Sequence, residues 1–215
     1  EDAMGRAPVR APYLVTAAMV GAASIAAAIV AVTGVARSGE PSPPVPAHVA
    51  RAADSVAASR AATVEIRVDR SSYSIAQTSR LGGIRFHLVR SASSEGECLD
   101  VFAFSTNDGD DAGHVGGCGA RKTDSVTEGW NVGGLLIDDR TVHIAFGYAE
   151  PSATTVTLTR ADGSTVPASL ANGTWLLVEE AGSQPPDDET QTEMPYVSIE
   201  SRNRSGEVLG STSLG

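Results

Sequence analysis

The pattern of apolar and polar positions divides the chain into an unbroken apolar run near the N-terminus and a long stretch of two-residue alternation. Residues 13–36 carry no charged side chain and too few polar ones to line one face of a soluble helix. From about residue 63 onward, apolar residues alternate with polar ones, which is the period of a strand that buries one face. The pattern predicts a mainly β protein, in which a single transmembrane helix precedes an antiparallel β-sandwich of immunoglobulin-like or similar type.

The apolar run is long enough to cross a membrane. Residues 13–36 would form a helix about 36 Å long, and a bilayer's hydrocarbon core is about 30 Å thick. Arg6 and Arg10 precede the run, whereas only Arg37 follows it closely. Since positive residues favour the cytoplasmic side, we expect residues 1–12 to be a cytoplasmic tail and the rest of the chain to lie outside the cell.

Cleavage of the run is the alternative. Gly34 and Ala36 are small residues at the spacing of a signal-peptidase site, so cleavage near Ala36 would release a secreted domain. The apolar segment of a signal peptide is usually about 7–15 residues long, and the greater length here favours an uncleaved anchor of the cell membrane. Because the chain begins with Glu1, a cytoplasmic segment could also precede it.

Residues 37–62 are interpreted as a linker. Its first part, residues 38–46, contains four prolines and predicts a stiff, partly polyproline spacer. Its second part, residues 47–62, is rich in alanine and predicts a short helix with a poor apolar face.

Residues 63–215 are predicted to form one extracytoplasmic β-sandwich domain. Strands about 8–12 residues apart argue for a sandwich or barrel, and residues rich in Asn, Asp and Gly supply the hairpin turns. The glycine- and aspartate-rich residues 107–117 are expected to form a loop. The alternation predicts strands over residues 64–68, 84–88, 99–104, 132–137, 141–148, 154–160, 165–170, 174–178, 196–200 and 207–211.

Composition restricts the partners and the compartment. The net charge of −10 disfavours nucleic acid, which requires a basic surface. Cys98 and Cys118 are the only cysteines, and an even number in an exported domain predicts a disulfide. That bond would close a loop of about 21 residues and stabilise the fold by about 3 kcal/mol. Zinc is disfavoured because only His114 stands at ligand spacing from a cysteine.

The histidines do not predict a metal site. His87 and His143 fall on the polar phase of their strands, so we expect solvated side chains. If their strands were neighbours, His114 could join them in a site, but no two of the four histidines, which include His48, stand at ligand spacing.

Catalytic motifs are absent as well. The acidic residues 107–111 lack the EF-hand register, and these residues and the acidic residues 187–193 are interpreted as solvated loops. The sequence contains no G-x-S-x-G, H-E-x-x-H or S-x-x-K motif and no glycine-rich phosphate loop. We therefore assign no catalytic, cofactor-binding or metal-binding residue and expect no enzyme, although a serine–histidine–carboxylate site built from distant strands stays open. Trp175 is the better core candidate of the two tryptophans, the other being Trp130.

Three segments carry a resemblance. Residues 98–119, 155–166 and 206–210 resemble stretches of uncharacterised exported proteins of actinobacteria, over roughly the last 120 residues. The resemblance implies an anchored β domain and no activity. The preference for arginine, with Lys122 as the only lysine among 16 basic residues, fits a GC-rich bacterial genome.

These observations predict an interaction or structural module at the cell envelope, anchored through residues 13–36, with an unknown protein or envelope partner. One alternative is the sensing half of a transmembrane regulator that acts on a partner such as a sigma factor. A second alternative is an envelope hydrolase.

Overall fold

The computed structural model describes residues 44–105, 111–119, 126, 129–138, 140–181 and 195–214, all within one unit, Gly34–Gly215. The predicted transmembrane run, residues 13–36, and the start of the linker lie outside the described residues. So do most of the two acidic segments, residues 107–111 and 187–193. Within the described part, no helix has the length and apolar character needed to cross a bilayer.

The described residues form one helix and eleven strands, so the fold is mainly β. These elements are α1 (Ala47–Thr63), β1 (Val68–Leu81), β2 (Ile84–Ser93), β3 (Gly96–Ser105), β4 (Asp111–Gly119), β5 (Trp130–Ile137), β6 (Arg140–Tyr148), β7 (Thr155–Arg160), β8 (Thr165–Ala171), β9 (Thr174–Glu180), β10 (Tyr196–Arg202) and β11 (Val208–Ser213).

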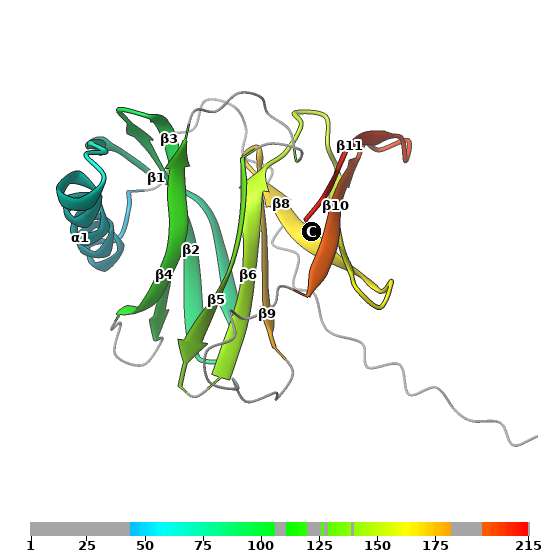
Figure 1. Cartoon of the computed structure of the whole chain (residues 1–215), viewed down its shortest axis with the longest axis horizontal. Helices are drawn as coiled ribbons and strands as arrows, with labels where there is room; N and C mark the ends of the chain where they lie inside the picture. The colour runs from blue at the N-terminus through cyan, green and yellow to red at the C-terminus, as the bar shows by residue number, and fades with distance from the viewer. Residues whose placement is uncertain are drawn as a thin grey trace, which may run out of the picture. The chain divides into compact units, whose positions relative to one another are not determined.

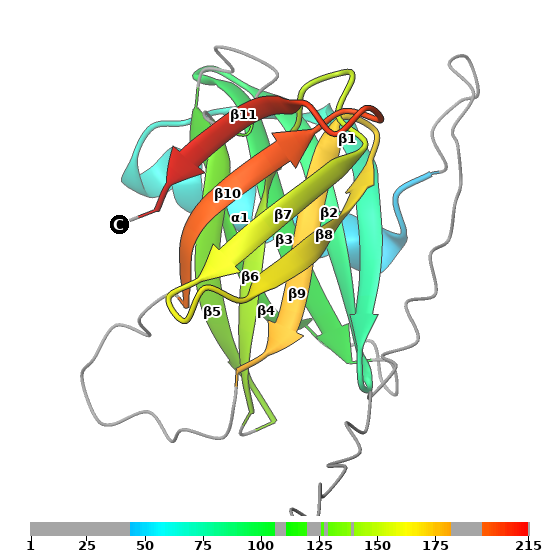
Figure 2. The same ribbon diagram turned by 90° about the vertical axis from the view of Figure 1, so that its right-hand side faces the viewer.

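Two antiparallel sheets make a sandwich-like fold that is covered on both sides (Figure 1). The four-stranded sheet has the order β1-β2-β3-β4, and α1 lies on its outer face. The seven-stranded sheet has the order β11-β10-β7-β8-β9-β6-β5. Its strands β5, β6 and β9 face the four-stranded sheet, whereas β7, β10 and β11 cross over their other side (Figure 2).

The long sheet folds over at β8. The first half of this strand pairs with β7 and its last residues, Ser169 to Ala171, pair with β9. The two halves of the sheet therefore enclose apolar side chains between them, in the manner of a second sandwich.

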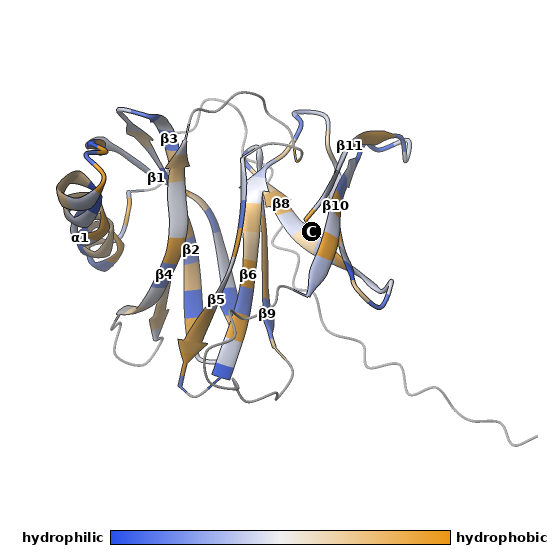
Figure 3. Cartoon of the chain, viewed as in Figure 1, coloured by the Kyte–Doolittle hydropathy of each residue, from blue (hydrophilic) through white to orange (hydrophobic). Residues whose placement is uncertain are grey.

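Three apolar clusters fill the spaces between these layers. The first, which includes Phe86 and Ile144, lies between the two sheets. The second, which includes Trp175, lies inside the folded sheet, and the third, which includes Phe102 and Phe104, lies under α1. Figure 3 shows the alternation of apolar and polar residues along β2 and β6 that builds them. Trp175 has no exposed surface, which confirms it as a core residue.

Most predicted strands are present, and the pairs β5–β6 and β10–β11 and the meander β7–β8–β9 form as the turn residues predict. The helix expected over residues 47–62 is α1. The strand expected over residues 64–68 is wrong, because α1 continues to Thr63 and Glu65 adopts a φ of 59°, which interrupts an extended chain. The first strand instead begins at Val68 and runs through a polar segment to Leu81.

The loop expected over residues 107–117 is wrong from residue 111 onward, where β4 begins. The glycines there serve close packing. A side chain at Gly116 would overlap the carboxylate of Asp100 on β3, and a side chain at Gly133 on β5 would lie 2.7 Å from Val115. β4 can therefore pair with β3 and pack against β5 only because it is built largely of small residues.

Candidate functional site

A buried ionic cluster joins α1 to the outer face of the four-stranded sheet. Asp100 on β3 has a side chain that is 7% exposed. Arg60, in the last turn of α1, donates two hydrogen bonds of 2.5 and 2.8 Å to the two carboxylate oxygens. On β4, His114 Nε2 lies 2.8 Å from Asp100 Oδ1. One carboxylate therefore connects a helix and two strands.

Asp100 stays ionised in this cluster. Burial acts to raise the pKa of its carboxyl group, but the hydrogen bonds with Arg60 and His114 outweigh burial, so its pKa is lowered. The same contact raises the pKa of the Arg60 guanidinium against the opposite effect of its own burial. Both carboxylate oxygens of Asp100 are engaged in hydrogen bonds, so the side chain connects α1, β3 and β4 and is not available as a base.

The predicted disulfide is present beside this cluster. Cys98 and Cys118 are directly opposite each other on β3 and β4, with their Cα atoms 4.0 Å apart. Cys98 lies two residues before Asp100 and therefore on the same face of the sheet. Strand β4 is thus fixed to β3 both by a covalent bond and by the contact between His114 and Asp100.

The expectation of solvated histidines is wrong for His87 and His143, which are 5% and 8% exposed. Both lie on the strand face that the alternation assigned as polar, which points away from the apolar cluster between the two sheets. The face that carries His87 is covered by α1 (Figure 1), and the face that carries His143 is covered by the folded-over half of the long sheet (Figure 2). The ring of His48 on α1 lies 6.1 Å from the His87 ring, and the ring of Tyr196 on β10 lies 6.4 Å from that of His143. Burial, and then the charges of His48 and Arg85, lower the pKa of His87 to about 4.

The structure does not bring His87, His114 and His143 together, because His143 belongs to the other sheet and His114 is engaged with Asp100. Over the residues that the structure describes, no three His, Cys, Asp or Glu side chains are grouped so that they could hold a metal ion.

A second polar cluster connects the two halves of the folded sheet. Glu179 on β9 accepts a 2.6 Å hydrogen bond from Arg160 on β7 and a 2.5 Å hydrogen bond from the hydroxyl of Tyr196 on β10. Burial, followed by the bond to Glu179, raises the pKa of Tyr196. Burial also lowers the pKa of His143, which lies next to Glu179 across the β6–β9 pair.

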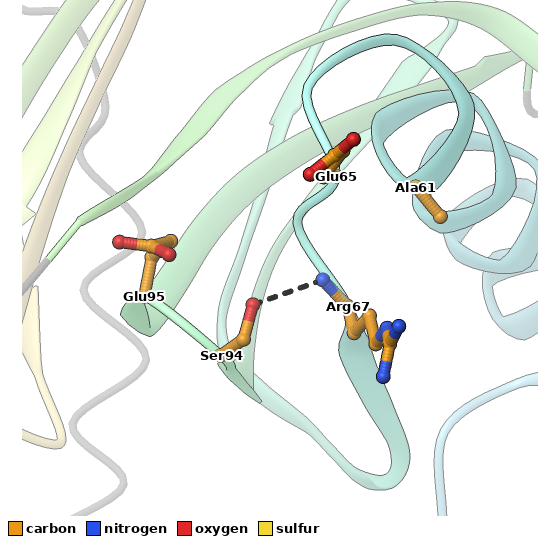
Figure 4. A pocket seen from close by; sticks show the side chains of 5 residues that line it. All are labelled: Ala61, Glu65, Arg67, Ser94 and Glu95. Atoms are coloured by element: carbon orange, nitrogen blue, oxygen red, sulfur yellow. Dashed lines mark hydrogen bonds between the residues drawn. The ribbon is translucent and has the colours of Figure 1, made fainter.

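An open hollow of about 560 Å³ lies where α1 ends, lined by Ala61, Glu65, Arg67, Ser94 and Glu95 (Figure 4). Its backbone is fixed, because the Arg67 amide donates to Ser94 Oγ at 3.1 Å and the Ser94 amide donates to the Arg67 carbonyl at 2.8 Å. The guanidinium of Arg67 points away from both carboxylates (Figure 4). The hollow therefore presents exposed charges of both signs from a well-held frame, which suits recognition of a polar partner.

Sequence reasoning missed both polar clusters. Asp100 did carry a signal, because it is the only charged residue in the otherwise apolar residues 99–104, and a charge in a buried strand requires a partner. The identity of that partner was not predictable, since Arg60 lies 40 residues earlier in the sequence. Comparison with known proteins adds no assignment to this geometry: no protein-family model, no curated protein and no solved structure matches the chain.

Proposed function

We propose that the chain is a single-pass, membrane-anchored module whose β domain acts outside the cell as an interaction or structural element of the envelope. The observation that carries the proposal is the attachment of α1, which directly follows the proline-rich linker. Arg60 fixes the end of this helix to Asp100, beside the disulfide between Cys98 and Cys118. A domain held at the end of a tether benefits from such a connection, and structural disulfides persist in oxidising compartments.

The hollow at the end of α1 is the proposed contact surface. Its charged side chains are exposed, and the neighbouring Val64 is 59% exposed. Non-obligate protein interfaces combine an apolar centre with a polar rim, and an exposed apolar side chain beside exposed charges is compatible with such a surface.

Photocrosslinking tests this proposal. A photoreactive phenylalanine derivative replaces Glu95 in the full chain, which is then irradiated in native membranes. We expect a discrete adduct with a protein or envelope polymer. The matched control carries the same derivative at the exposed Ser211 on β11, and we expect no such adduct there. Equal labelling at both positions, or none at position 95, would contradict the proposed surface.

The proposed topology has its own test. A reporter that is active only in the cytoplasm, fused after residue 215, is expected to give no signal. Strong reporter activity would overturn the extracytoplasmic placement and leave the contact surface to be tested on the other side.

The sensing half of a transmembrane regulator is a second candidate, and the buried contact between α1 and His87 favours it. The His48 ring is 4.7 Å from that of Phe104 and 6.1 Å from that of His87, so protonation of His87 would place a charge beside the start of α1. Hydrogen exchange of the α1 amides, compared at pH 7.5 and at pH 3.5, below the His87 pKa of about 4, tests this candidate. Unchanged protection would remove it.

A further inference from the structure

Helix α1 begins without the usual groups that satisfy its first amides. The residue before the helix is Pro46, which makes no side-chain capping bond, and the first turn contains no acidic residue. The first amides of a helix carry a partial positive charge and lack partners within the helix. In a 17-residue helix this end is a favourable place for an anion, provided that other groups there also point to one.

Two buried side-chain nitrogens without hydrogen-bond partners lie under this end. His87 Nε2 and Arg85 Nε are both buried and make no hydrogen bond. His87 is 5% exposed, and its Nδ1 lies 3.2 Å from Thr78 Oγ1 on the neighbouring strand. In the tautomer in which the Thr78 hydroxyl donates to Nδ1, the neutral ring carries its proton on Nε2, which is then a donor without an acceptor.

The two donors lie on one face of β2, because they are two residues apart. His48, the second residue of α1, places its ring 6.1 Å from that of His87 and 4.7 Å from that of Phe104, which is directly opposite Arg85. The start of the helix and the two orphan donors therefore share one location.

A second guanidinium group lies beside them. Arg80 on β1 is directly opposite Arg85 on β2, so both guanidinium groups extend from the same face of the sheet. Like charges placed directly opposite each other destabilise a strand pair. Among the described residues, no carboxylate forms an ion pair or a hydrogen bond with either arginine, although the chain as a whole has a net charge of −10.

We propose that the start of α1, together with Arg80, Arg85, His48 and His87, forms a binding site for a phosphate group. The helix amides and His87 Nε2 supply neutral donors, and the two arginines supply the charge. A tetrahedral oxyanion has enough acceptor oxygens to satisfy all of these donors, and arginine pairs with phosphate in a two-bond geometry. The site does not depend on the hollow at the other end of α1 or on the proposed envelope function.

The test uses the full chain, uniformly labelled with nitrogen-15, in micelles of an uncharged glycolipid detergent. Inorganic phosphate is added at constant ionic strength while the NMR signals of His48 and His87 and the amides of residues 47–49 are followed. We expect saturable shifts of these signals. Arg80→Gln, a change at an exposed residue, is expected to weaken binding about tenfold. Arg85→Gln is expected to weaken it at least as much.

Arg202→Gln is the matched control, because Arg202 is an arginine of β10 that already pairs with Glu200. It is expected to leave the phosphate affinity unchanged. Absence of saturable shifts, or equal weakening by Arg80→Gln and Arg202→Gln, would overturn the site.

The source of the phosphate group is decided by a second arm. The same signals are compared in lipid nanodiscs with and without phosphatidylglycerol, and in detergent with glycerol 3-phosphate. Shifts caused by phosphatidylglycerol alone would identify a lipid headgroup, whereas shifts caused only by glycerol 3-phosphate would identify a soluble ester. No shift in any arm would contradict the proposal.

Discussion

Replacement of Asp100 by Asn tests the role of the buried cluster that holds α1. The change keeps the shape of the side chain but leaves the guanidinium of Arg60, which is 14% exposed, without its counter-charge. Removal of one partner from a buried ion pair costs about 3–5 kcal/mol, because the remaining charge stays desolvated. Since Arg60 lies in the last turn of α1 and retains some exposure, we expect a loss of about 3 kcal/mol in the free energy of unfolding.

Urea unfolding of the full chain in detergent, followed by the fluorescence of the buried Trp175, measures this loss. Hydrogen exchange adds a local reading, because the amides of α1 are expected to lose protection before those of β6 and β9. The charge itself is isolated by the double variant Arg60→Met/Asp100→Leu, since replacement of a buried ion pair by apolar residues is often close to neutral. The double variant should therefore recover most of the stability that Asp100→Asn loses.

The matched control is Asp54→Asn, on the same helix. Asp54 and Arg70 form an exposed pair at 3.3 Å with side chains that are 41% and 61% exposed, and such pairs contribute about 1 kcal/mol or less. If Asp100→Asn costs no more than Asp54→Asn, or leaves the exchange of α1 unchanged, the reasoning about the cluster is refuted.

Three further predictions concern pH, the disulfide and strand packing. The pKa of His87 is about 4 in the fold and about 6.5 in the unfolded chain, so the unfolded state binds more protons between these values. Stability should therefore fall as pH decreases from 6.5 to 4, by at most about 3 kcal/mol, and urea midpoints of wild type and His87→Phe at pH 7 and 4.5 measure this. Reduction of the bond between Cys98 and Cys118 should cost about 3 kcal/mol and lower the melting temperature, whereas two reactive thiols in the native protein would contradict it. Gly116→Ala should cost about 1–3 kcal/mol in thermal unfolding, whereas Gly119→Ala, with open space around it, should be near neutral.

Hairpins were predictable because their signals are local. Asn172 and Gly173 adopt φ values of 52° and 70° between β8 and β9, a backbone that Asn and Gly adopt more readily than other residues. The flanking alternation then determines which side chains share a face. No distant contact is needed for this step, and the meander β7–β8–β9 follows from its own residues.

The number of layers was not predictable in the same way. Alternation shows that a strand has an apolar and a polar face, but not whether another element covers the polar one. His87 and His143 fall on polar faces and are buried, because α1 returns over one sheet and the other sheet folds back on itself at β8. Strand β4 was missed for a related reason, since its glycines are explained by neighbours on β3 and β5 and not by its own pattern.

The buried polar side chains lie where layers meet, and this placement argues for a role in specifying the fold. Gln77 on β1 donates to the carbonyl and hydroxyl oxygens of Thr174 on β9, 97 residues away, at 2.6 and 3.0 Å. Asp100 joins α1 to β3, and Glu179 joins the halves of the folded sheet. Apolar faces alone would permit several arrangements of the layers, because hydrophobic contact is non-directional. In any arrangement other than the native one, a buried polar group would lose its partner, and an unpaired buried polar group is costly. We infer that the apolar alternation drives the layers together, and that these few polar pairs, formed between residues far apart in sequence, decide which layer lies on which.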